Sequence, residues 1–312
     1  MRTSWSRHPA LIAVASLAVL TGCSSSSDSG SDSGTSQDAA SSSAVPVVAS
    51  TNVYGDIAKE IGAGRVKVTS IVSDPSQDPH SYEANTRNQL ALSKAKVVIE
   101  NGGGYDDFVD RMLKGGNNAS PEVINAVKTS GRTAPEGEEL NEHVWYDFPS
   151  VAKLADRIAA GLAKADPDHA STFTKNAKAF KAKLKPLEAK ERQIKSDHEG
   201  EAVAITEPVP LYLTEASGLE NKTPEAFSEA IEEGDDVSPK TLQSTLALFS
   251  GKKVKALVYN EQTTGPQTKK VEGAAKKAGI PVVSVTETLP EGKGYIAWMT
   301  ANVDALASAL DQ

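Results

Sequence analysis

Cysteine and aromatic residues are scarce in this sequence, and long apolar runs are almost absent. One cysteine, Cys23, occurs in 312 residues, which excludes an internal disulfide and a metal site built from several thiolates. Any metal must therefore be held mainly by nitrogen and oxygen. Aromatic residues make up 5% of the chain, so there is little surface on which a large planar ligand would stack.

Basic side chains are also fewer than acidic ones. The chain has 33 basic and 41 acidic side chains, for a formal net charge of -8, and no Lys/Arg-rich block that would follow a phosphate backbone. This excludes nucleic acid as an expected partner. Only the first stretch is continuously apolar, which excludes a polytopic membrane protein. The length suffices for two lobes with a sizeable core.

Residues 1–22 have the features of a signal peptide. Arg2 and Arg7 precede an apolar run, Ala10 to Leu20, that is too short to span a bilayer core of about 30 Å. The run leads into Leu20-Thr21-Gly22-Cys23, which resembles the bacterial lipoprotein processing box, where the cysteine is acylated and becomes the new N-terminus. The alternative is an ordinary secreted protein with an incidental cysteine.

Residues 24–44 are mostly Ser, Gly and Asp. They carry no large apolar group to offset the entropy cost of ordering, so residues 23–44 are predicted to be an acylated cysteine and a disordered linker. A coil of this length spans roughly 25 Å. We therefore expect a lipid-anchored protein at the outer face of the cytoplasmic membrane.

From Val45 the pattern predicts an α/β lobe over 45–148. Short β-branched runs alternate with segments of helical spacing, which is typical of a parallel sheet with helices on its faces. The predicted strands are 45–50, 66–73, 96–102 and 122–127, and the predicted helices are 54–64, 85–95 and 105–116.

Residues 149–199 read as helices. Phe173, Ala177, Phe180, Leu184 and Leu187 form the apolar stripe of an amphipathic helix of about 30 residues over 167–198. A helix of that length is a surface helix of one lobe or, the interpretation we favour, a rigid connection between two lobes. Pro186 lies inside the stripe and predicts a kink or a break.

A second α/β lobe is predicted over 200–312. Three strand-like runs, at 201–206, 254–260 and 280–286, are each followed by a helical segment, and Ser238-Pro239 is a helix start signal. The predicted fold class is thus α/β, with two lobes that each contain a small parallel sheet and that are joined by one long helix.

Four potential metal ligands follow strands. His80 and His143 lie in the loops after the second and fourth strands, while Glu207 and Glu287 directly follow strands of the second lobe. Ligands of open α/β sheets bind outside the carboxyl ends of the strands. Each residue alone has a plainer explanation, as a solvated loop histidine or as a charge at a helix start.

Two imidazoles and two carboxylates around a divalent ion give a neutral site of nitrogen and oxygen donors, which suits zinc or manganese. Glu83 and Asp147 are candidates for orienting the imidazoles, because a ligating histidine normally donates its other N–H to an oxygen. A zinc hydrolase is the enzymatic alternative, but HExxH, G-x-S-x-G and P-loop motifs are absent from the sequence. We therefore expect a binding protein and not an enzyme.

At these residues the sequence resembles the metal-binding lipoproteins that supply the zinc and manganese ABC importers of bacteria. The resemblance is carried by DPHSYE around His80, NEHVWYD around His143, TEPVPLYLTEASGL containing Glu207, and VTETLPEGKGYIAWM around Glu287, together with the lipobox. It implies that these four residues bind the metal. It also implies a monomer that delivers zinc or manganese to a membrane permease and its ATPase.

Two departures from the family pattern bear on the metal. Many zinc-dedicated relatives have a third histidine where this chain has Glu207, and a histidine-rich loop before the second histidine motif, where this chain is acidic. The fourth carboxylate is often aspartate, where this chain has Glu287. These donors resemble the manganese-type members, yet zinc binds a fixed N/O site more tightly than manganese. The sequence leaves the choice of metal open, together with the alternatives of an adhesin and of a haem or siderophore binder.

Overall fold

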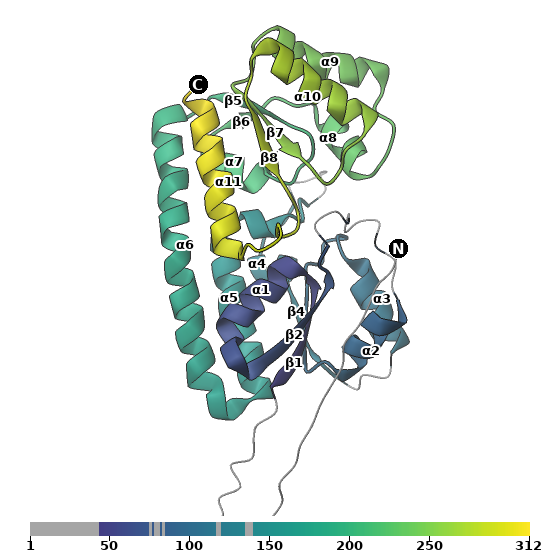
Figure 1. Cartoon of the computed structure of the whole chain (residues 1–312), viewed down its shortest axis with the longest axis vertical. Coiled ribbons are helices and arrows are strands. Elements are labelled where there is room, and N and C mark those ends of the chain that lie inside the picture. Colours follow the sequence, from purple (N-terminus) through teal and green to yellow (C-terminus); the bar gives the residue numbers. More distant parts are fainter. Residues whose placement is uncertain (1–43, 75–76, 78–81, 83–84, 117–119, 135–139) are drawn as a thin grey trace, which may run out of the picture. The chain divides into compact units, whose positions relative to one another are not determined.

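Two four-stranded parallel sheets, each flanked by helices, form the framework of the protein in a computed structural model (Figure 1). The structure describes residues 44–74, 77, 82, 85–116, 120–134 and 140–312. The predicted signal peptide, Cys23 and most of the linker lie outside these residues. Among the described residues, no helix is both long and apolar enough to cross a bilayer.

The first sheet comes from the N-terminal half and has the strand order β2-β1-β3-β4. Its strands are β1 (Val45–Thr51), β2 (Val66–Val72), β3 (Val97–Glu100) and β4 (Glu122–Asn125). Its helices are α1 (Asn52–Gly62), α2 (Thr86–Lys94), α3 (Asp107–Gly115), α4 (Ala126–Ser130) and α5 (Phe148–Ala165). The strand predicted over 122–127 ends at Asn125, because the Asn125 side chain caps α4 by accepting from Lys128 N.

The second sheet repeats this topology with the order β6-β5-β7-β8, again with every neighbouring pair parallel. Its strands are β5 (Ala202–Ile205), β6 (Glu220–Asn221), β7 (Ala256–Asn260) and β8 (Val282–Val285). Its helices are α7 (Leu211–Ala216), α8 (Glu225–Glu232), α9 (Pro239–Ser250), α10 (Pro266–Ala278) and α11 (Tyr295–Leu310). The predicted fold class is confirmed, whereas β6 and α8 were not predicted.

Successive side chains of a strand point to opposite faces of the sheet, and a different set of helices packs on each face. In β5, Val203 and Ile205 belong to the core shared with α6, α7 and α11, while Ala204 faces the core of α8, α9 and α10. In the first sheet, α1 and α5 cover one face and α2 and α3 the other. The core that contains α6 includes side chains of both sheets. The two sheets are therefore joined by packing as well as by the chain.

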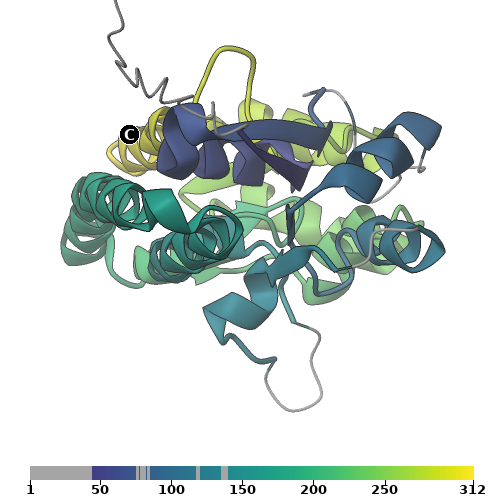
Figure 2. The same cartoon turned by 90° about the horizontal axis from the view of Figure 1, so that it is seen from below.

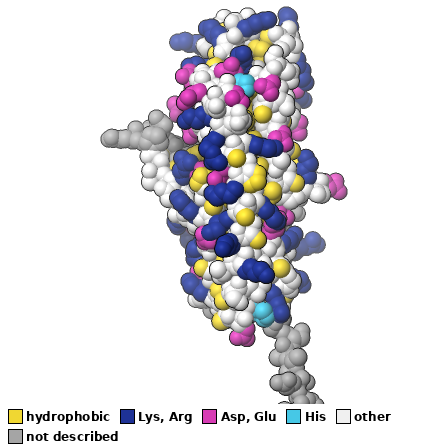
Figure 3. All heavy atoms as spheres, turned by 90° about the vertical axis from the view of Figure 1, so that its left-hand side faces the viewer, with side chains coloured by type: hydrophobic (Ala, Val, Ile, Leu, Met, Phe, Trp, Pro, Cys, Tyr) yellow, Lys and Arg dark blue, Asp and Glu magenta, His cyan; other side chains and the backbone are white. Residues whose placement is uncertain are grey.

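The long helix α6 (Ala170–His198) has 29 residues, as the apolar stripe predicts. Its buried side chains pack against α5, which lies beside it, and against α1 and α11 (Figure 2). Its outer face carries many lysines among other polar groups (Figure 3). The helix continues through Pro186, so a break there is a wrong prediction. Leu184 and Leu187, both buried, hold the helix on either side of the proline and offset the cost of about 3 kcal/mol.

Candidate metal centre

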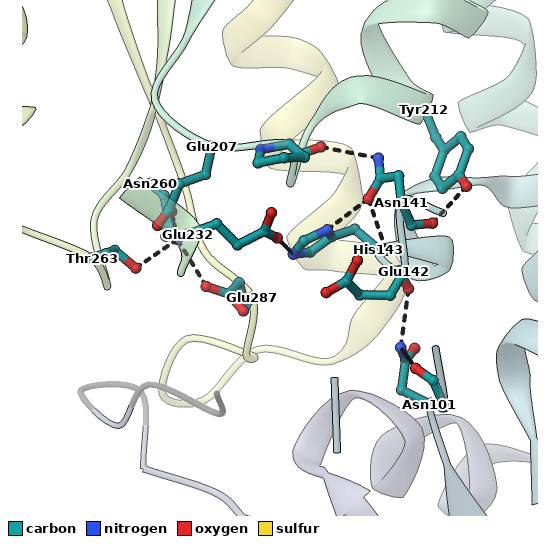
Figure 4. Close-up of polar contacts among 12 residues, drawn as sticks. Asn101, Asn141, Glu142, His143, Glu207, Tyr212, Glu232, Asn260, Thr263 and Glu287 are labelled. Carbon is teal, nitrogen blue, oxygen red and sulfur yellow. Dashed lines mark hydrogen bonds and ion pairs between the residues drawn. The ribbon is translucent and has the colours of Figure 1, made fainter. Parts of the chain in front are cut away.

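His143 is fully buried, between the loop at 140–142 and the short 3₁₀ turn Val144–Tyr146. Its Nδ1 lies 2.7 Å from Asn141 Oδ1, and its backbone N–H donates to the same oxygen at 3.1 Å. Asn141 Nδ2 donates to the carbonyl of Pro208 at 3.1 Å, which fixes the orientation of the amide. Asn141 Oδ1 must therefore accept from His143 Nδ1–H, and in the neutral imidazole Nε2 is the ring nitrogen that would bind a metal (Figure 4).

Glu207 and Glu287 follow the carboxyl ends of β5 and β8, the strands on either side of β7. Each is 2% exposed, and each accepts a hydrogen bond from the side-chain amide of Asn260, the last residue of β7. The distance from Asn260 Nδ2 to Glu287 Oε1 is 2.8 Å. Strand order reverses between β5 and β7, which is where ligands of parallel sheets bind.

Burying the Glu207 and Glu287 carboxylates together is electrostatically unfavourable when both are ionised. Two buried carboxylates repel each other, and a neutral amide between them does not cancel their charge. A divalent cation bound by both would offset the repulsion and the cost of burying them. The carboxylate and imidazole donors fit zinc or manganese.

Tyr105 lies near both His143 and Glu287. The Tyr105 and His143 rings are 6.0 Å apart, centroid to centroid, and nearly perpendicular. Burial raises the pKa of Tyr105 well above its ordinary value, and the neighbouring Glu287 carboxylate raises it further. The Trp145 ring packs against the His143 ring, with 5.0 Å between the centroids.

Glu232, at the C-terminus of α8, lies against His143 and was missed by the sequence analysis. Its Oε1 is 3.4 Å from His143 Nε2, and Figure 4 shows its side chain extending toward the imidazole. Ligand atoms of Glu142, His143 and Glu232 all lie within 4.8 Å of one another. The sequence held no signal for it, because α8 itself was not predicted.

The other predicted site residues are distributed as follows. His80 and Glu83 lie outside the described residues. Asp147 is buried, and its carboxylate forms an ion pair with Arg132 at 2.9 Å and accepts from Ser150. The oxygen at His143 Nδ1 is Asn141 Oδ1, two residues earlier in the chain.

The loops of the centre are tied together across the two halves of the chain. Tyr212 donates to the Asn141 carbonyl at 2.6 Å, and Tyr146 donates to the Thr286 carbonyl at 2.8 Å. Gln262 donates to the Gln77 carbonyl at 3.2 Å and accepts from the Glu287 N–H at 2.6 Å. The backbone around His143, Glu207 and Glu287 is thus fixed by contacts from several elements.

Comparison with known proteins finds relatives over most of the chain. The sequence is 30% identical to the manganese-binding lipoprotein MntA of Bacillus subtilis, over 85% of this chain and 89% of that protein. It is 28% identical to the manganese ABC transporter substrate-binding lipoprotein scaA of Streptococcus gordonii, over 86% and 90% of the two chains.

Solved structures share the fold. The periplasmic zinc-binding protein TroA from Treponema pallidum matches with a TM-score of 0.73 and 22% identity, over 85% of this chain and 99% of that one. The solute-binding protein FpvC of Pseudomonas aeruginosa, solved with Mn²⁺, matches with a TM-score of 0.70 and 22% identity, over 86% and 98%.

A family model covers nearly the whole described part of the chain. The model of the periplasmic zinc-uptake complex component A matches residues 47–309, which include both sheets, the long helix and the three buried residues His143, Glu207 and Glu287. The chain therefore belongs to the family of the periplasmic zinc-uptake complex component A.

Proposed function

We propose that this protein captures a divalent transition metal, zinc or manganese, and delivers it to an ABC-type permease and its ATPase. The observation that carries the proposal is the pair of buried carboxylates, Glu207 and Glu287, joined through one Asn260 amide. Family membership and relatives named as manganese- and zinc-binding proteins support the same function.

The proposed ligands are His80, His143, Glu207 and Glu287. His143 offers Nε2, because Asn141 holds the proton on Nδ1. His80 follows Gln77 by three residues, and the Gln77 carbonyl accepts from Gln262, which also binds the backbone of Glu287. This connection supports a fourth ligand from the same loop.

We further propose that Cys23 carries the lipid anchor and that residues 24–44 tether the metal-binding body to the outer face of the membrane. The relatives named as lipoproteins support this arrangement. Replacing Cys23 by serine should release the protein from the membrane fraction and abolish palmitate labelling, while metal binding by the purified body stays unchanged.

The two lobes, with proposed boundaries at 45–148 and 200–312, should move little relative to each other. Asn52 exchanges two hydrogen bonds with the Leu289 backbone, and Asp56 accepts from the Tyr295 N–H at 2.7 Å. These contacts, with the packing along α6, favour metal release by rearrangement of the ligand loops. A wide opening of the lobes between metal-bound and metal-free crystal structures would contradict this mechanism.

The function is tested by purifying the native protein without chelators and measuring its metals by mass spectrometry. We expect about one zinc or manganese per chain in the wild type and a large loss in His143→Ala. His169→Ala is the matched control, since His169 pairs with Asp166 outside the centre. In a strain lacking the gene, wild type and the control should restore metal accumulation, and His143→Ala should not. Full restoration by His143→Ala would refute the transport function.

A further inference from the structure

We infer that the outer face of α6 docks on the anionic lipid headgroups of the membrane to which the protein is tethered. The inference rests on the lipid tether of the proposed function and does not depend on the metal centre. It concerns four basic side chains of α6, called the basic row: Lys175, Lys178, Lys185 and Arg192.

The basic row lies on the side of α6 that points away from the core. Its members are spaced three or seven residues apart, so they project from one side of the helix. The buried residues of α6, such as Phe180 and Leu187, lie on the opposite side. All four basic side chains are exposed, and Figure 3 shows lysine and arginine along this face of the molecule. Because the helix continues through Pro186, the row extends over about 26 Å.

The other exposed side chains along the row are short, which suits contact with a flat surface. They include Ala179, Ala182, Pro186 and Ala189. Two acidic residues of α6 lie within the same stretch, but Glu191 is buried and the Glu188 side chain is only 15% exposed. The long basic side chains can therefore reach one plane without an acidic group projecting beyond them.

The row carries positive charge that the protein does not fully neutralise. Lys185 and Arg192 share one partner, Glu188, at 2.9 and 3.9 Å. Among the described residues, neither Lys175 nor Lys178 forms an ion pair. The whole helix has eight basic and three acidic side chains, in a chain whose net charge is -8. Positive charge is thus concentrated on this face, where it complements an anionic lipid surface.

The proposed tether makes such an attraction effective. At physiological salt the attraction decays over a Debye length of about 8 Å, and a linker that spans roughly 25 Å keeps the body close to the bilayer. The linker joins the body at β1. Val45 pairs with Val66, just after α1, and Ile61 near the end of α1 accepts from Asn176 of α6 at 2.9 Å. The basic row therefore begins at the end of the body to which the linker is attached.

Vesicle binding by the Cys23→Ser protein tests the inference without the lipid anchor. Vesicles of phosphatidylglycerol and phosphatidylcholine are compared with vesicles of phosphatidylcholine alone, at about 0.1 M salt. We expect binding to the anionic vesicles only, with a loss of at least about fivefold at about 0.5 M salt.

A matched pair of double variants separates the basic row from net charge. Lys175→Glu/Lys178→Glu should weaken binding to the anionic vesicles by about tenfold or more. Lys269→Glu/Lys270→Glu changes the net charge equally at exposed positions of α10, on the other face of the second sheet, and should weaken binding less than about threefold. Unchanged urea denaturation curves show that both variants are folded.

A single fluorescent label gives the orientation. Cys23 is the only cysteine, so the Cys23→Ser protein can be labelled at one chosen position. A dye at Ala182→Cys, within the basic row, should be quenched by anionic vesicles that carry a headgroup quencher. A dye at Gly273→Cys, exposed on α10, should not be quenched.

Three results would overturn the inference: no binding to the anionic vesicles, equal weakening by the two double variants, or equal quenching at the two labelled positions. None of them bears on the proposed function, which the metal titration and the palmitate labelling of Cys23 test separately.

Discussion

Glu191 should destabilise the protein at neutral pH, so that Glu191→Gln stabilises it. Glu191 lies on the inner face of α6 and is 5% exposed. Burial raises its pKa to about 8, with further contributions from the negative charges of Asp147 and Glu188. The carboxyl group is therefore largely protonated in the folded protein at pH 7, whereas it is ionised in the unfolded chain.

The sign of the pH dependence follows from this difference. The ordinary pKa of a glutamate is 4.5, and that of Glu191 in the folded protein is about 8. Between these two pH values the folded state binds the proton and the unfolded state does not. Stability is therefore greatest below the ordinary pKa and is lost as the pH rises toward 8. At about 1.4 kcal/mol per pKa unit, the cost relative to a neutral side chain is about 1 kcal/mol at pH 5 and about 4 kcal/mol at pH 8.

Urea denaturation of the metal-free protein at pH 5, 7 and 8 measures this cost. The difference in unfolding free energy between Glu191→Gln and wild type should increase by roughly 3 kcal/mol from pH 5 to pH 8. Glu291→Gln, at an exposed position, should show no such increase. A difference that stays constant with pH, or that falls as the pH rises, would refute the reasoning about Glu191.

Three further predictions concern single contacts. Asn260→Ala removes the amide that joins Glu207 and Glu287, and should weaken metal binding about 10- to 100-fold in a competition titration; unchanged affinity would contradict its role. Tyr295→Phe removes a buried hydrogen bond of 2.6 Å to the Trp145 carbonyl, and should cost about 1–3 kcal/mol of unfolding free energy in urea. Leu184→Ala empties a fully buried position of α6 and should cost about 2–5 kcal/mol in the same assay; a loss below 1 kcal/mol would show that α6 is not part of the core.

The sequence predicts most of the fold because the strands are marked by β-branched residues and the helices by apolar spacing. The second lobe was predicted less completely. Strand β6 has two residues, too few for a pattern, and α8 has eight, fewer than the helices that periodicity identifies reliably. A break at Pro186 was wrongly offered beside a kink, because the local cost of a proline is visible in sequence, while the packing that offsets it is not.

The sequence named some of the residues that lie at the candidate centre, and it missed others. His143, Glu207 and Glu287 could be identified as candidate ligands because they follow strands. All three are buried in the structure. Asn260 and Glu232 could not, because amides and carboxylates are common on surfaces and only the tertiary fold brings these two to the centre. The contact of Asn141 with His143 Nδ1 was also not predicted, since the choice among nearby oxygens depends on loop conformation.

The central claim is that buried carboxylates and imidazoles of this chain bind a divalent metal. A competition titration of Zn²⁺ and Mn²⁺ against wild type and the double variant Glu207→Gln/Glu287→Gln tests it most directly. We predict sub-micromolar binding of at least one metal by the wild type and at least roughly 100-fold weaker binding by the double variant, because the carboxylates supply the negative charge of the site. No binding by the wild type, or equal binding by both proteins, would contradict the claim.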